Sequence, residues 1–367
     1  MKKSKGIRLE KNKYDFVYNA RIFLLWSAYI LICIQYFLSW HIEGSDVICR
    51  YLTASCLILS FKYEKVNFFK IFLFIFLIVA FVFRRFLIVW CLYAMVYQFI
   101  DYCIPLKKIV KIAIIVLSII FIVLIDGILM GLFENEGEIY IKSTEVIYDL
   151  GTGNANRCAS LFFKFVILLY LLLKNKHPYY LICYILIISY IGYNINGSRA
   201  VLATSLLLAF LSILYWNNGF RNWMKYLIAS FPILMYFLTF YLAFNLEDFK
   251  EFNKIASGRL WYIMKFTQDF TLKDWLFGAP RTIDDPLDSS YLEIIHTGGI
   301  CLAFFFCTSY FITIINDYKK ITPFLPVMIT MLVMGLSESI LLRPTDISVI
   351  FWMIILQKKY YKSQYKL

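Results

Sequence analysis

Long apolar segments recur along almost the whole chain, and they constrain its fold more than any other feature of the sequence. A helix needs about 20 mostly apolar residues to cross the hydrocarbon core of a bilayer, within a range of about 17–25. About twelve segments, plus or minus two, fit this requirement. They lie near 20–39, 46–61, 67–83, 86–104, 109–132, 158–173, 178–194, 199–215, 223–244, 290–315, 323–341 and 345–357. The pattern predicts an all-α polytopic membrane protein with about twelve transmembrane helices.

The composition excludes a soluble globular protein. Of the 367 residues, 61% are hydrophobic and 17% are charged, whereas soluble domains have about 45–50% apolar and about 25% charged residues. We therefore expect residues 1–367 to form a single integral membrane domain. The net charge of +13 is attributed to cytoplasmic loops rather than to nucleic-acid binding, because lysine and arginine concentrate on that side of membrane proteins.

Cysteine and histidine residues form no recognisable ligand set. Most of the nine cysteines fall inside apolar segments without a Cys-x-x-Cys pair, and His41, His177 and His296 are scattered. Buried cysteines of this kind behave as small hydrophobic residues, and a metal site needs clustered ligands. We expect no disulfide, no metal site and no cofactor.

The distribution of charge predicts the orientation of the chain. If the N-terminus is cytoplasmic and the spans alternate, most basic residues fall on inner connectors and most acidic residues fall outside, with Arg84-Arg85 as an exception. The two termini are then cytoplasmic tails over 1–19 and 358–367. Two outer loops result, a smaller one over 133–157 and a large one over 245–290. No small-residue cleavage site follows the first apolar segment, which is therefore predicted to be a span rather than a signal peptide.

The large outer loop, 245–290, is one long polar stretch among the spans, and we expect the chemistry of the protein to occur there. Within it, Leu260, Ile263, Met264 and Phe266 have helical spacing. This spacing predicts a short amphipathic helix that lies on the outer leaflet.

Arginines on the predicted outer face are candidates for ligand binding. They are Arg199, Arg259, Arg281 and Arg343. Arginine binds phosphate with two parallel hydrogen bonds, and the glycines before Arg199 and Arg259 let the backbone approach a ligand. The start of a span at Ser198 adds free N–H groups to this side. The alternative is that each arginine only extends its side chain to the membrane surface.

Asp288 is the candidate acid or base, because it stands where the large loop enters a span. Burial at such a junction raises the pKa of a carboxyl group, and a carboxylate there accepts a proton from a sugar hydroxyl. The alternative is an N-cap, a position that favours Asp288 or Ser289. The two roles are compatible.

Three further residues are predicted to lie in the interior of the protein. Glu293 is one turn inside a span and Glu338 is deep in the next, and both are candidates to pair with Arg259 or Arg343. His296 is interpreted as a packed interior residue. At the end of the smaller loop, over 151–157, Asn154, Asn156 and Arg157 are read either as a turn that starts a helix or as ligands for a polar group.

The order of these motifs resembles that of a known family. Asn-x-Asn at 154–156 precedes Gly-Ser-Arg at 197–199, and Ser-Gly-Arg at 257–259 precedes Asp-Ser-Ser-Tyr-Leu at 288–292. This order resembles the O-antigen polymerase/ligase superfamily, and most closely the Wzy-type polymerases of polysaccharide repeat units. The resemblance covers roughly residue 149 to the C-terminus.

The resemblance implies a C-type glycosyltransferase fold and metal-independent, inverting glycosyl transfer at the outer face of a bacterial cytoplasmic membrane. It implies glycans on undecaprenyl pyrophosphate as donor and acceptor, with a flippase and a chain-length regulator as pathway partners. Arg199 and Arg259 match pyrophosphate-binding arginines, assisted by Arg281 or Arg343. Asp288 stands where the ligase branch has histidine. The expected supporting residues are Asn156, Ser198, Ser257, Tyr291, Glu293 and Glu338.

Three other functions stay open at this point. A ligase of the same superfamily is one, although Asp288 in place of histidine argues against it. A repeat-unit flippase is the second, but a flippase places its charges in a central cavity rather than at the outer edge. A secondary transporter is the third, and it predicts broken spans in matched halves of the chain.

Overall fold

The computed structural model describes residues 2–62, 68–82, 85–133, 137–139, 146–152, 154–175, 178–255, 258–279 and 288–356. Within these residues the chain is mostly helical, and its described strands form one antiparallel hairpin of β1 (Gly137–Ile139) and β2 (Val146–Tyr148), in which Glu138 lies opposite Ile147. The all-α expectation therefore holds for the described chain except for this hairpin, which lies in the smaller of the two predicted outer loops. The predicted tail 358–367 lies outside the described residues.

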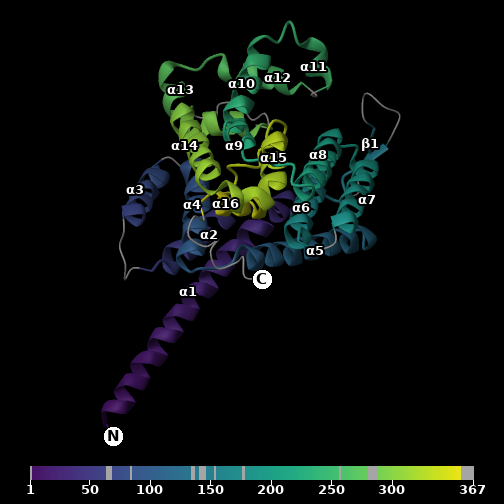
Figure 1. The fold of residues 1–367 in the computed structure, drawn as a ribbon. Coiled ribbons are helices and arrows are strands. Elements are labelled where there is room, and N and C mark those ends of the chain that lie inside the picture. The colour runs from purple at the N-terminus through teal and green to yellow at the C-terminus, as the bar shows by residue number, and fades with distance from the viewer. Residues whose placement is uncertain are drawn as a thin grey trace.

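The described residues of the first part of the chain form eight helices. They are α1 (Lys2–His41), α2 (Ser45–Ser60), α3 (Phe68–Val82), α4 (Arg85–Asp101), α5 (Leu106–Leu129), α6 (Ala155–Leu173), α7 (Pro178–Asn196) and α8 (Arg199–Trp216). Because α1 is continuous, residues 2–19 of the predicted tail are helical and extend from one end of the molecule (Figure 1).

The second part begins with α9 (Met224–Ala229) and α10 (Phe231–Phe244). It continues with α11 (Lys250–Ile255), α12 (Arg259–Thr267), α13 (Leu272–Phe277), α14 (Ser290–Ile321), the 3₁₀ turn η1 (Thr322–Phe324), α15 (Leu325–Met334) and α16 (Asp346–Leu356).

Six helical stretches of the described chain are long and apolar enough to cross a membrane. They are Phe16–Gln35, Leu106–Leu129, Asn156–Leu173, Pro178–Asn196, Arg199–Trp216 and Ser290–Met334. Other predicted spans are helical but shorter, since α2, α10 and α16 have 16, 14 and 11 residues, below the length of about 17–25 that a span needs. The described chain thus has the apolar helices of a polytopic membrane protein, and six of its helical stretches have full spanning length.

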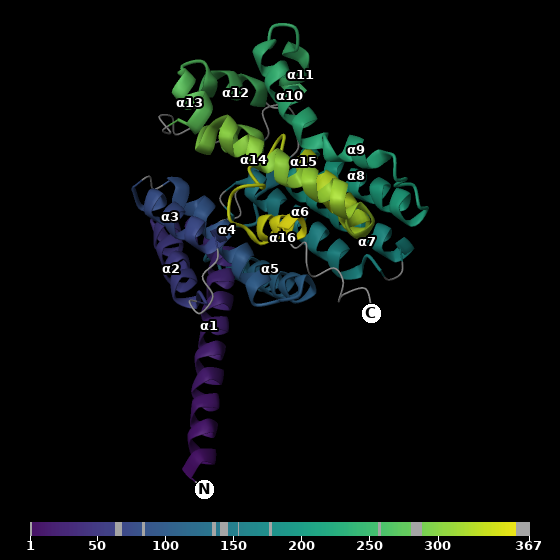
Figure 2. The ribbon, with the colours of Figure 1, turned by 60° about the vertical axis from the view of Figure 1, so that its left-hand side comes forward.

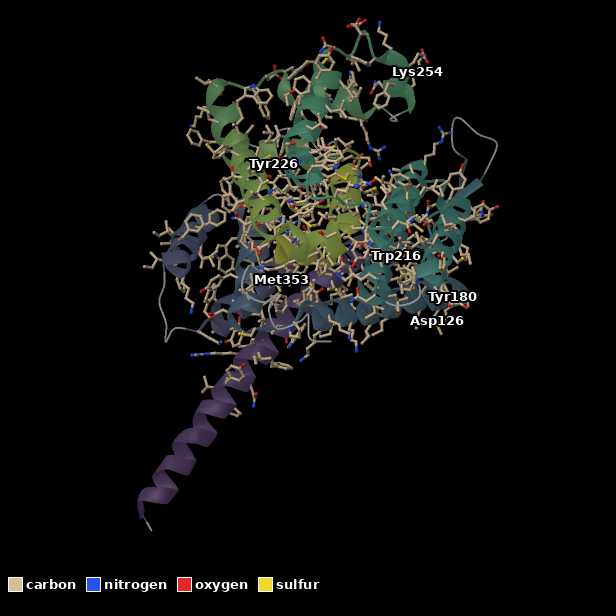
Figure 3. All side chains as sticks on the ribbon, in the orientation of Figure 1. Asp126, Tyr180, Trp216, Tyr226, Lys254 and Met353 are labelled. Atoms are coloured by element: carbon tan, nitrogen blue, oxygen red, sulfur yellow. The ribbon has the colours of Figure 1, made fainter. Side chains whose placement is uncertain are left out.

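Helix α16 lies at the centre of the bundle, where α1, α4, α5, α6 and α14 contact it (Figure 2). Every residue from Asp346 to Ile355 is buried. A helix that is apolar on all sides is stable only when protein or lipid surrounds it, and here protein surrounds it. Met353, labelled in Figure 3, is among its fully buried residues.

The large loop folds into a helical cap, formed by α11, α12 and α13, at the end of the molecule opposite the N-terminus (Figures 1 and 2). Lys254 lies at its outer end (Figure 3). The apolar side chains Leu260, Ile263 and Phe266 of α12 pack with Ala243 of α10 and Leu292 of α14. The sequence placed this apolar face on the outer leaflet, and that placement is wrong because α10 and α14 cover it.

Two glycines attach the cap to α14. The N–H of Ala279 donates to the carbonyl of His296 at 3.0 Å. Gly278 and Gly299 have φ of 87° and 63°, values that side-chain-bearing residues rarely adopt. A Cβ on Gly299 would overlap the backbone of Leu276, and one on Gly278 would lie 2.7 Å from the carbonyl oxygen of His296. The end of α13 therefore rests directly on the backbone of α14.

Candidate functional site

A non-helical segment, residues 335–345, separates α15 from α16 inside the fold. The sequence placed Glu338 deep in a span over 323–341, but α15 ends at Met334. The expectation was wrong because Gly335 ends the helix, and Pro344 also disfavours helix at the residue before it. Glu338 is thus carried by a loop between two buried helices.

The hydroxyl of Ser290 holds this loop in place. It donates to the carbonyl of Glu338 at 2.6 Å and accepts from the N–H groups of Ile340 and Leu341 at 2.8 and 3.2 Å. The indole of Trp352 donates to the carbonyl of Leu341 at 2.9 Å. Irregular backbone is tolerated within a membrane protein where protein groups pair it or where it lines a cavity, and both conditions apply here.

A polar cavity of about 380 Å³ opens beside the loop. Its wall combines the end of α1 (Ser39 and Trp40), the beginning of α6 within 154–164, Asp288, and the loop within 338–345. The residues predicted from the sequence that line this cavity are Asn154, Asn156, Arg157, Asp288, Glu338 and Arg343. They come from separate parts of the chain.

Two ion pairs between arginine and glutamate border the cavity in the described residues. Nη2 of Arg259 lies 3.5 Å from Oε1 of Glu338, and Nε of Arg343 lies 2.8 Å from Oε1 of Glu293. The sequence left open which arginine each carboxylate meets, and the structure provides both pairs. Nε of Arg259 is buried and has no hydrogen-bond partner in the described chain, so this guanidinium keeps a donor for another acceptor.

Glu338 is the titratable group at the centre of this arrangement. Its side chain is 20% exposed. Burial raises the pKa of its carboxyl group from 4.5 to about 7, Arg259 opposes this rise, Asp288 adds to it, and Arg343 opposes it. A carboxyl group with a pKa near neutrality is suited to accept and release a proton.

Asp288 lies half-buried at the cavity, directly before α14. The N-cap of α14 is Ser289, whose hydroxyl accepts weakly from the N–H of Leu292 at 3.5 Å. Of the two predicted caps the structure therefore selects Ser289. Asp288 lines the cavity and makes no hydrogen bond or ion pair within the described part of the chain. Its carboxylate is therefore available to a ligand in the cavity.

The remaining predicted residues lie elsewhere. Arg199 is the exposed first residue of α8, whose cap is Ser198, and it is not part of the cavity wall. Its guanidinium makes no hydrogen bond or ion pair in the described residues. Tyr291 is fully buried and donates to the carbonyl of Leu332 at 2.8 Å, which makes it a packing residue. Ser257 and Arg281 lie outside the described residues.

His296 is a packed residue, as expected. It is 6% exposed, and its ring lies 6.1 Å from that of Phe266 and 6.0 Å from that of Phe270. The histidine therefore helps to join the cap to α14.

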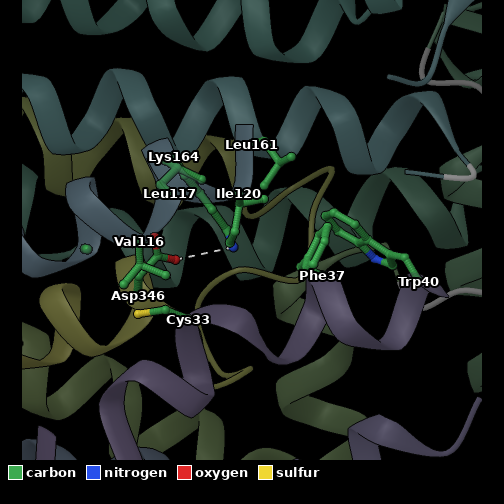
Figure 4. A pocket seen from close by; sticks show the side chains of 10 residues that line it. Cys33, Phe37, Trp40, Val116, Leu117, Ile120, Leu161, Lys164 and Asp346 are labelled. Carbon is green, nitrogen blue, oxygen red and sulfur yellow. Dashed lines mark ion pairs between the residues drawn. The ribbon is translucent and has the colours of Figure 1, made fainter. Parts of the chain in front are cut away.

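A buried ion pair at the base of the cavity was missed from the sequence. Nζ of Lys164 in α6 lies 3.3 Å from Oδ1 of Asp346, and the two side chains are 8% and 5% exposed (Figure 4). Lys164 lines this cavity and also a much smaller one beneath it, beside Cys33 and Trp40. The signal that would have found it is a lone lysine in the apolar segment 158–173, since charges at membrane depth are candidates for function.

No protein-family model, curated protein or solved structure matches this chain. The fold and composition together define the class, a membrane protein with several apolar helices.

Proposed function

We propose that the protein is a glycosyltransferase that polymerises oligosaccharide repeat units carried on undecaprenyl pyrophosphate, and so builds a bacterial surface polysaccharide. The observation that carries the proposal is the cavity, which Asp288, Glu338 and Arg343 line together. Arg259 forms an ion pair with Glu338 beside it. Carboxylates beside arginines suit a reaction in which a hydroxyl loses a proton while a phosphate leaves. The motif order from residue 149 onward supports the same function.

In the proposed reaction, a hydroxyl oxygen of the acceptor sugar attacks the anomeric carbon of the donor from the face opposite the diphosphate. The bond between that carbon and the diphosphate oxygen breaks, and undecaprenyl diphosphate leaves with the electron pair. Asp288 takes the hydroxyl proton and later releases it to water. Arginines beside the diphosphate stabilise the charge that develops on the leaving group, and a cavity that orients both glycans supplies much of the rate.

The finer features of the fold belong to the same proposal. We propose a C-type glycosyltransferase architecture in the cytoplasmic membrane, with the cap outside and both termini inside. The shorter helices would then complete about twelve crossings. A flippase that delivers the repeat units and a chain-length regulator are the proposed pathway partners. Arg199, Arg281 and Ser257 stay predictions.

The test is a strain that lacks this protein, complemented with variants, whose lipid-linked and polymeric glycans are separated on a gel. We expect Asp288→Asn to lower polymer about 100-fold or more, and Arg259→Ala to lower it strongly, while single repeat units accumulate on lipid. Arg221→Ala is the matched control, since Arg221 is exposed and does not line the cavity. Normal polymer in both site variants would overturn the proposal.

The same strain separates the alternatives. Loss of a polymerase leaves single repeats exposed on the outer face, whereas loss of a flippase leaves them on the inner face. Loss of a ligase leaves long polymer on the lipid carrier. Either of the last two results would replace the proposed function.

A further inference from the structure

The wall of the cavity formed by α1 and α6 carries an arginine that the proposed reaction does not yet use. Arg157 lies in the first turn of α6 and lines the cavity. Its guanidinium carbon lies 6.0 Å from the centre of the Trp40 ring, and its Nη1 donates to the carbonyl of Thr152 at 3.3 Å. These two contacts orient the guanidinium and leave most of its N–H donors without a protein partner in the described chain.

Arg157 differs from the other arginines at the site by having no carboxylate partner within the described residues. Arg259 and Arg343 each contact a glutamate, so an anion that binds there competes with a carboxylate. Lys164 is likewise paired, with Asp346. Asp149, the acidic residue close to Arg157 in sequence, accepts instead from the N–H of Gly151 at 2.9 Å.

The groups that line the cavity differ in chemistry, and Arg343 and Lys164 are among them as cations that are already paired. Asp288 and Glu338 supply carboxylates, whereas Asn154, Asn156 and Arg157 supply amide and guanidinium groups at the beginning of α6. A ligand with a negative group at one end and a hydroxyl at the other is best placed with the negative group next to Arg157, because the carboxylates repel it and the other cations at the cavity are paired with carboxylates in the described residues.

We infer that Arg157, held against Trp40, is a principal contact for the diphosphate of the lipid-linked substrate. This inference rests on the proposed function, and it turns Arg157 from one of several candidate ligands for a polar group into a principal diphosphate contact. In this position the guanidinium donates to the diphosphate oxygens, and the glycan extends from there toward Asp288.

The test measures the thermal stability of the full-length protein in detergent during titration with sodium pyrophosphate, with sodium sulfate at equal ionic strength as the reference. We expect pyrophosphate to stabilise the native protein more than sulfate does. Arg157→Ala weakens the apparent affinity by about tenfold or more, the range for hydrogen bonds between charged groups. Arg157→Lys keeps the charge without the planar donor pair and shows an intermediate loss. Arg221→Ala is the control and leaves the affinity unchanged.

Three results would overturn the inference. Pyrophosphate could stabilise the native protein no more than sulfate does, or Arg157→Ala could bind pyrophosphate with the same apparent affinity as the native protein. The third is that Arg199→Ala, and not Arg157→Ala, weakens the affinity for pyrophosphate. A further arm adds phosphatidylglycerol, a phospholipid that also presents a phosphate. Equal stabilisation by this lipid, lost in Arg157→Ala, would assign the site to a membrane headgroup and would also reject the diphosphate.

Failure of this inference and failure of the proposed function give different results. If the deletion strain lacks polymer but Arg157→Ala binds pyrophosphate normally, Arg157 is rejected and the polymerase stands. If Arg157 is required for pyrophosphate binding but the deletion strain makes normal polymer, the diphosphate site stands and the polymerase is rejected.

Discussion

At the scale of single residues, Glu338 carries the most information because its charge depends on its neighbours. The unfolded chain releases the Glu338 proton near pH 4.5, whereas the folded protein retains it up to about pH 7. Between these values the folded state binds more protons, so stability falls as pH rises through this window and levels off above it. The loss is at most about 3 kcal/mol, since a pKa difference of 1 corresponds to about 1.36 kcal/mol.

Glu338→Gln removes this dependence while keeping the size of the side chain. We expect the melting temperature of the purified variant to vary less than that of the native protein between about pH 4.5 and pH 7. The difference between the two melting curves isolates Glu338 from the other titrating groups. Parallel curves across the window would show that Glu338 has an ordinary pKa.

The charged residues at the cavity show which side-chain contacts can be predicted from a sequence and which cannot. Glu293, Glu338, Arg259 and Arg343 could be singled out because a charge in or beside an apolar segment needs a partner. Which carboxylate met which arginine could not be predicted, because the pairs join residues 50 and 79 positions apart in sequence. Such contacts depend on how the helices pack.

At the scale of elements, the contact between α13 and α14 determines how the cap is attached. Gly299 interrupts the helical geometry of α14 with φ 63° and ψ −162°, and the backbone of Leu276 occupies the space that a side chain would need. The contact is therefore possible only with glycine at position 299.

Gly299→Ala is expected to destabilise the protein by more than about 2 kcal/mol, because strain at positive φ adds to a backbone clash. The control is Gly44→Ala, since Gly44 also has a positive φ, 74°, but has no neighbouring atom within 4 Å of its Cβ position. Proteolysis and thermal unfolding measure the two effects. Equal losses in the two variants would mean that the contact between α13 and α14 contributes nothing.

The existence of the helices could be predicted from apolar periodicity. The N-caps at Asn154, Ser198 and Ser289 could be predicted because asparagine and serine side chains accept hydrogen bonds from N–H groups at helix starts. The break before α16 could be predicted only over 342–344, and its beginning at Gly335 could not, because Leu336, Ile340 and Leu341 continue the apolar pattern of a span. The buried face of α12 was also assigned to the wrong surroundings, since periodicity identifies an apolar face without identifying what covers it.

At the scale of the whole molecule, three contacts between helix ends each join residues that charge alternation assigns to the same side of the membrane. On the predicted outer side, His41 stacks on Phe133 at 4.1 Å. On the predicted inner side, Lys62 donates to the carbonyl of Asp101 at 2.9 Å, and Tyr318 donates to that of Arg221 at 3.1 Å. Ends assigned to one side thus contact each other.

Labelling of introduced cysteines tests this orientation. In a variant without the nine native cysteines, Lys254→Cys places a thiol on the cap and Asn222→Cys places one beside Arg221. A maleimide that does not cross membranes is expected to label the first position in intact cells and the second only after permeabilisation. The reverse pattern would invert the predicted topology, and labelling of both in intact cells would rule out opposite sides.

The pair between Lys164 and Asp346 also bears on the order in which the protein is made. Lys164 is synthesised with α6, whereas its partner is near the end of the described chain. Until α16 is complete, α6 carries a charge whose insertion alone costs about 2.5–3.5 kcal/mol at the centre of a bilayer. The charge of Lys164 is therefore neutralised only after α16, the last described helix, has been made and packed into the bundle. A chain that stops before Asp346 has an unpaired lysine charge in α6.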